Sequence, residues 1–195
     1  MFPIIGKGVG SKGGMVMSDN PMDKRGRIAD YIPLIQAANG LTLSQVCSLS
    51  SLEPSTIQNW IKRGYVPHPT AKKYHERHLA RILLIASLRD SMQIDRVGEL
   101  LHYINGDTDD ESDDIITEEA LYDLFCDVTD ILGTTTPSPK GVGEIVEETL
   151  RSCPGITENR EKIAEALEVM AYTYMANIYK QKVDSFFNNK PLISC

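Results

Sequence analysis

A cluster of basic side chains lies in the middle of this chain. Within residues 62–81 the only acidic residue is Glu76, whereas six residues are cationic: Lys62, Arg63, Lys72, Lys73, Arg77 and Arg81. Cations at this density contact nucleic-acid phosphates, although a similar composition also occurs on the solvated face of a helix and loop. The choice between these interpretations depends on the elements that position the side chains.

The basic cluster begins inside a helix-turn-helix pattern. Thr42 and Gln45 have the spacing of a capping box, which predicts a first helix with an apolar inner face. Residues 50–53 then have the composition of a turn. Proline is tolerated in the first turn of a helix, so we expect a second helix from Pro54 to about Arg63, where a glycine follows.

The second helix separates an apolar face from a polar face. Ile57, Trp60 and Ile61 recur at helical spacing and are expected in the core, although Trp60 could also stack on a base. The polar residues of the opposite face are candidate readers of base edges: Ser55, Thr56, Gln58 and Asn59. Candidate phosphate anchors follow: Lys62, Arg63, Lys72, Lys73 and Tyr74.

The segment between the second helix and the next one is expected to be extended. Pro67 and Pro69 exclude a regular helix there, so the sequence predicts two short extended pieces around a turn. Such a hairpin would form a small wing, with its basic residues at 70–74. Two further helices are expected over 76–91 and 94–104.

Residues 41–104 resemble the DNA-binding domain of the MerR family of bacterial regulators. The matching pieces are Leu43–Val46, Thr56–Ile57, Gly64–Pro67, Lys72–Tyr74, Leu79–Ile82, Leu88–Asp90, Ile94–Val97 and Leu100–Leu101. The whole chain looks like an uncharacterised family of bacterial MerR-like regulators. The resemblance implies a winged helix-turn-helix module whose second helix enters the major groove. The Arg-Tyr-Tyr-Glu-Arg usual in that family is replaced here by the segment 58–62.

Charge divides the chain into two parts. Residues 41–104 carry a net charge of +3, whereas residues 105–195 carry −12. We therefore expect four regions: a glycine-rich tail (1–27), the DNA-binding module (28–104), an acidic linker (105–116) and a helical dimerisation or effector region (117–195). A calcium loop within 107–114 is not expected, because the glycine and glutamate of that motif are missing.

The C-terminal region is expected to be helical. Its last helix should run from Thr157 to about Phe187, with an apolar stripe at Ile163, Leu167, Met170, Tyr174 and Ile178. The stripe keeps no strict heptad beyond Ile178, so we interpret it as the buried face of a globular helix, possible also at a dimer interface, rather than a zipper. Met and Tyr residues there could alternatively line an effector pocket.

Several functional classes lack support in the sequence. No Walker A, G-x-S-x-G or H-E-x-x-H motif occurs, so no enzyme and no cofactor are expected. His75 and His78 have no neighbouring cysteine, and the four cysteines lie far apart, so we expect no metal and free thiols. Without a long apolar run the chain should not enter a membrane, and we expect a cytoplasmic protein.

The expected protein is mainly α, with a winged helix-turn-helix module followed by a helical C-terminal region. Its expected function is sequence-specific transcription regulation. The recognition helix 54–63 would lie in the major groove of double-stranded DNA, and the protein would be a homodimer because paired modules read paired half-sites. A small molecule or protein could act as effector at the C-terminal helices. The alternative is a protein-interaction adaptor that keeps the helix-turn-helix fold without binding DNA.

Overall fold

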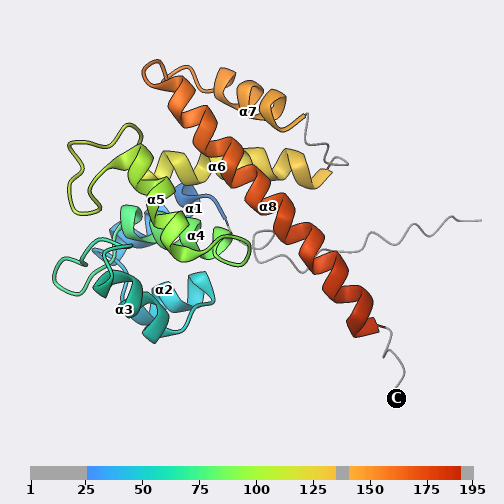
Figure 1. Cartoon of the computed structure of the whole chain (residues 1–195). Coiled ribbons are helices and arrows are strands. Elements are labelled where there is room, and N and C mark those ends of the chain that lie inside the picture. Colours follow the sequence, from blue (N-terminus) through green and yellow to red (C-terminus); the bar gives the residue numbers. More distant parts are fainter. Residues whose placement is uncertain (1–25, 135–140, 190–195) are drawn as a thin grey trace, which may run out of the picture.

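The computed structural model describes residues 26–134 and 141–189, and these residues are mainly helical (Figure 1). The expected glycine-rich tail over 1–27 lies almost wholly outside them. The helices are α1 (Ile28–Ala37), α2 (Leu43–Ser50), α3 (Pro54–Lys62), α4 (Glu76–Leu88), α5 (Ile94–Asn105), α6 (Glu118–Thr134), α7 (Val142–Arg151) and α8 (Arg160–Asn189). The described residues contain two isolated β-bridges and no β-strand.

Helix α4 is the centre of the fold. Every residue from His78 to Leu88 is buried, because α1, α2, α5, α6 and α8 all pack around this helix. Buried apolar side chains from α1 through α8 form one continuous core. The described parts of the regions expected at 28–104 and 117–195 therefore share their core, through the contact of α4 with α6.

The two helices of the helix-turn-helix pattern begin where the sequence predicts. The Thr42 side chain accepts a hydrogen bond from the Gln45 backbone N–H at 3.3 Å, and the Gln45 side chain accepts one from the Thr42 N–H at 2.8 Å. This capping box starts α2, and Ser51 ends it in the left-handed conformation. Pro54 occupies the first turn of α3. The predicted lengths of both helices are confirmed to within about a turn.

The expected wing contains no strand among the described residues. Lys73 N–H donates to the Thr70 carbonyl at 2.9 Å, and this bridge closes a tight turn whose central residues, Ala71 and Lys72, both have positive φ. A second bridge joins Tyr74 to Leu41, just before α2. Only this turn and two bridges stand where a hairpin was predicted. The mainly helical fold is confirmed, whereas the winged form is not shown.

Helix α8 packs along the body and then projects beyond it (Figure 1). Its 30 residues correspond to a rod of about 45 Å at 1.5 Å per residue. Ile163, Leu167, Met170 and Tyr174 are buried against α6 and neighbouring helices, as the apolar stripe predicts. None of the described helices combines the length and apolar character needed to cross a membrane.

Candidate nucleic-acid interface

Helix α3 presents a polar face to solvent. Ile57 and Trp60 are buried, so the helix is oriented as its apolar spacing predicts. On the opposite side Ser55, Gln58, Asn59 and Lys62 are exposed, and Thr56 is half-buried. The four candidate base readers therefore lie on or beside one accessible face, in the helix that follows the turn of the helix-turn-helix pattern.

Arg63, at the end of α3, is held by neighbouring groups. Its guanidinium donates to Asp95 at 2.8 Å and to the Tyr65 hydroxyl at 2.8 Å, and it lies over the Tyr65 ring. The Tyr65 hydroxyl also donates to Asp95, and this hydrogen bond raises the pKa of Tyr65 above its usual value. Arg63 is accessible, but part of its charge is already balanced by the carboxylate of Asp95 in the first turn of α5.

The three candidate anchors around the tight turn have different environments. Lys72 is exposed at the tip of the turn. The Lys73 ammonium instead donates to the carbonyls of Ala38 and Gly40, at 3.1 and 3.0 Å, where it caps the C-terminal end of α1. Tyr74 is only 4% exposed. The phosphate-anchor role expected for Lys73 and Tyr74 does not match these positions, because their side chains serve the fold.

The remaining cations of the cluster point inward. Arg81 is 1% exposed and pairs with Glu118, which is 0% exposed, at the start of α6. Its other nitrogens donate to the Tyr65 carbonyl at 2.7 Å and to the Thr108 hydroxyl at 3.1 Å. Arg81 therefore connects α4 with α6, with the segment after α3 and with the acidic segment. The continuous basic surface suggested by the sequence is therefore interrupted in space.

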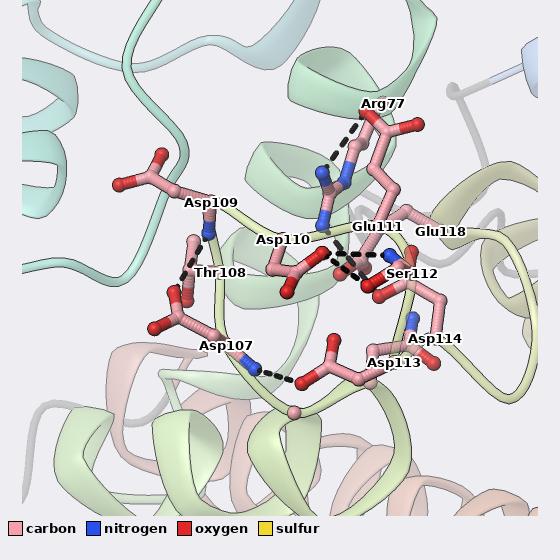
Figure 2. Close-up of polar contacts among 12 residues, drawn as sticks. Arg77, Asp107, Thr108, Asp109, Asp110, Glu111, Ser112, Asp113, Asp114 and Glu118 are labelled. Carbon is pink, nitrogen blue, oxygen red and sulfur yellow. Dashed lines mark hydrogen bonds and ion pairs between the residues drawn. The ribbon is translucent and has the colours of Figure 1, made fainter.

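Arg77 points into the acidic segment 107–114, between Glu111 and Asp114 (Figure 2). Its guanidinium lies 3.0 Å from a Glu111 carboxylate oxygen and 3.6 Å from one of Asp114. Burial raises the pKa of Asp114 to about 6, against the opposing effect of Arg77. This ion pairing gives the segment a partner on α4 and corrects the expectation of a wholly solvated linker.

The acidic segment is also folded on itself. The N–H groups of Asp107, Asp109 and Ser112 donate to the carboxylates of Asp113, Asp107 and Asp110, at 2.9–3.0 Å (Figure 2). Such side-chain to backbone bonds are typical of turns built from Asp. The carboxylates are therefore directed to the chain's own N–H groups and arginines. In the described part of the chain, no group of three potential ligands is arranged to hold a metal ion.

The histidines near the cluster have structural hydrogen bonds. His78 Nδ1 accepts from the His75 N–H at 3.1 Å, and Nε2 lies 3.2 Å from the His68 carbonyl, to which it donates. Burial lowers the pKa of His78 below its usual value. His68 contacts Asp109, and the His68 backbone N–H helps to lower the pKa of that carboxylate. These contacts fix the segment after α3 against α4 and the acidic segment.

The C-terminal residues considered for an effector pocket divide between core and surface. Met170, Tyr174 and Met175 are buried in the core, whereas Tyr172 and Tyr179 are exposed. A shallow hollow of about 430 Å³ lies where α8 passes the turn between α4 and α5, and Met92, Ala176 and Lys180 line part of it. An effector at these helices stays a prediction.

Part of the chain is similar to a known family model and to a curated protein. Residues 34–125 match the model of a domain of unknown function (DUF1836). This stretch runs from α1 through the acidic segment into α6. The chain is 31% identical over 113 residues to the uncharacterized protein YkrK of Bacillus subtilis (strain 168), covering 54% of this chain and 48% of that protein. The chain thus spans about half the length of this curated relative.

These matches correct the family resemblance drawn from the sequence. The model that matches residues 34–125 is neither the MerR family nor another helix-turn-helix family. The motif pieces quoted for MerR are short, and capped helices with a polar outer face occur in many folds. The assignment to MerR-like regulators is therefore wrong. No solved structure matches the chain.

Proposed function

We propose that this protein binds duplex DNA through the outward face of α3 and acts as a sequence-specific transcription regulator. The observation that carries this proposal is the arrangement of α2 and α3. Two short helices are joined by a three-residue turn, and the second helix exposes Ser55, Gln58, Asn59 and Lys62. A helix of this kind fits the major groove, where amide side chains pair with the edges of adenine.

Within this proposal, Lys62 at the end of α3 and Lys72 in the tight turn contact phosphates. Lys62 and Lys72 are exposed, and no acidic side chain of the described residues lies within ion-pair distance of either. Arg63 contributes in addition when a phosphate competes with Asp95 for its guanidinium. The turn at Ala71–Lys72 takes the place that a wing has in winged helix-turn-helix proteins.

The backbone of that turn supports a functional role for Lys72. Positive φ is unfavourable for residues with a Cβ, at about 1–2 kcal/mol each, yet Ala71 and Lys72 both adopt it. Glycine would relieve the strain at either position. Strain of this kind gathers at functional sites, where the surrounding structure holds it in place. Here the strained turn presents an exposed cation.

The base-reading part of the proposal is tested with duplexes selected from the source genome and a scrambled duplex of equal length. Gln58→Ala and Asn59→Ala should lose about 1–3 kcal/mol of discrimination each while still binding the scrambled duplex. Ser44→Ala, an exposed change on α2, is the control and should keep the preference. Unaltered discrimination in both α3 variants would remove these residues from the interface.

A second candidate is a protein-interaction adaptor that uses the same helix pair without DNA. The observation that favours it is the internal use of Lys73, Arg77 and Arg81, which leaves few cations on the α3 side. An adaptor would show no binding to any duplex even at low salt. In that case neither the wild type nor the α3 variants would bind DNA measurably. The substitutions would also leave the free energy of unfolding unchanged.

A further inference from the structure

Exposed apolar side chains gather on one helix. Of the large apolar residues that are well exposed in the described part of the chain, most lie on α8, and their exposed fractions run from 41% to 56%. They are Val169, Tyr172, Tyr179, Val183, Phe186 and Phe187. Scattered single apolar residues are normal on a protein surface, but a concentration on one element marks an interaction site.

These residues form a stripe with a regular repeat. Together with the exposed Ala176, positions 169, 172, 176, 179, 183 and 186 are separated by three and four residues in alternation. This is the spacing of the a and d positions of a coiled coil. The stripe lies on the side of α8 opposite to Ile163, Leu167, Met170 and Tyr174, which face the core. One side of the helix therefore packs on its own chain, and the other presents a heptad seam to solvent.

The exposed area is of the size that an interface between two chains requires. An aromatic side chain buries about 150–250 Å², so the three half-exposed rings of the stripe, the neighbouring Phe187 and the two valines leave roughly 500 Å² on each copy. Two such stripes would bury about 1,000 Å² together, which is near the lower limit for a specific interface. Tyr and Phe are also enriched at the centres of protein interfaces.

We propose that the stripe on α8 binds the same stripe of a second copy of this chain, with the two helices antiparallel. In this arrangement Val169 lies opposite Phe186 of the second copy, Tyr172 opposite Val183, and Ala176 opposite Tyr179. Each layer then combines a large side chain with a smaller one, as close packing requires. Parallel helices would instead place Tyr172, Tyr179 and Phe186 each against its own equivalent and would leave a gap at Ala176.

The space around α8 can accommodate the helix of a second copy. The small Ala176 lines the hollow of about 430 Å³ beside the turn between α4 and α5, which leaves room for a tyrosine ring of the second copy. The far part of α8 projects from the body (Figure 1), so a second helix can lie along it. The antiparallel arrangement also places the two bodies at opposite ends of the helix pair. This inference does not depend on DNA binding by α3.

The proposal is tested by sedimentation velocity on the full chain over a concentration series. We expect a species of twice the 21.7 kDa mass of one chain. Val183→Glu combined with Phe186→Glu should shift the protein to the monomer. Leu34→Glu, at a residue of similar exposure on α1, is the matched control and should remain dimeric. Circular dichroism confirms that all variants keep their helices.

Cross-linking then tests the antiparallel order. A mixture of Val169→Cys and Phe186→Cys proteins, mildly oxidised, should give disulfide-linked pairs of one copy of each variant, whereas Phe186→Cys alone should not pair with itself. Efficient self-pairing of Phe186→Cys would contradict the antiparallel arrangement. A wild-type monomer at every concentration would mean that another segment or a different protein covers the stripe, and it would overturn the proposal, as would a dimer unaffected by the double substitution.

Discussion

The two halves of the basic cluster have opposite roles in the structure. The outward half, Lys62, Arg63 and Lys72, is exposed to solvent, whereas the inward half, Lys73, Arg77 and Arg81, bonds to the chain's own carbonyls and carboxylates. Each half holds three cations, and both lie within the same twenty residues. The difference teaches that cation density alone does not define a binding surface, because tertiary partners decide which charges remain available.

The largest expected effect comes from removing a partner of the inward half of the cluster. Glu118→Ala leaves the buried Arg81 without its carboxylate and should lower the free energy of unfolding by about 3–5 kcal/mol. Urea denaturation measures this change. Glu99→Ala, which removes the partner of Arg96 in an exposed ion pair, is the control and should cost less than about 1 kcal/mol. Equal losses in the two variants would contradict a structural role for the Arg81–Glu118 pair.

The acidic segment should make stability depend on pH. Because burial raises the pKa of Asp114 from 3.8 to about 6, the folded protein holds a proton that the unfolded chain has released in this range. The contribution of Asp114 to stability should therefore decrease as the pH rises from about 4 to about 6. Asp114→Asn cannot titrate, so its midpoint of thermal unfolding should lack this decrease relative to wild type. Parallel pH profiles would show that Asp114 is solvated.

Lys72 and Lys73 are adjacent in the sequence but belong to different halves of the cluster. Lys73→Ala removes two hydrogen bonds to the end of α1 and should cost about 1–2 kcal/mol of stability. Lys72→Ala removes an exposed cation and should leave stability within about 0.5 kcal/mol of wild type. Chemical denaturation of both variants measures the contrast. Similar stabilities would show that Lys73 does not cap α1 in solution.

The smallest effect concerns the strained turn. Ala71→Gly keeps the turn but removes a Cβ from a residue with positive φ, so it should raise the free energy of unfolding by up to about 1 kcal/mol. The gain is partly offset by the greater freedom of glycine in the unfolded chain. A higher midpoint of thermal unfolding is the expected readout. A clear loss of stability would mean that Ala71 does not adopt this conformation.

Local signals account for the parts of the fold that the sequence predicted well. The capping box at Thr42, Pro54 at the start of α3 and the inward spacing of Ile57 and Trp60 depend on residues only three or four positions apart. The same holds for the buried stripe of α8. Such features are set by backbone geometry and helical periodicity, so they can be inferred from the sequence alone.

The parts that were missed depend on distant partners. Arg81 looks like an exposed cation until Glu118 is placed beside it, and the two residues are 37 positions apart. The acidic segment resembles a solvated linker until Arg77 balances its charge. A hairpin was expected at 65–74, but the two prolines restrict pairing, so only a turn and two bridges form there. The outer heptad of α8 is hard to recognise in the sequence, because the buried stripe of the same helix has the same spacing of three and four residues.

Fluorescence anisotropy with a labelled duplex over a salt series tests most directly whether the outward half of the cluster binds DNA. We predict salt-sensitive binding by the wild type. Lys62→Ala combined with Lys72→Ala should weaken binding to all duplexes alike and reduce the salt slope by about two. Arg151→Ala, an exposed cation on α7, should change neither. The absence of binding at low salt, or an unchanged slope in the double variant, would contradict the claim.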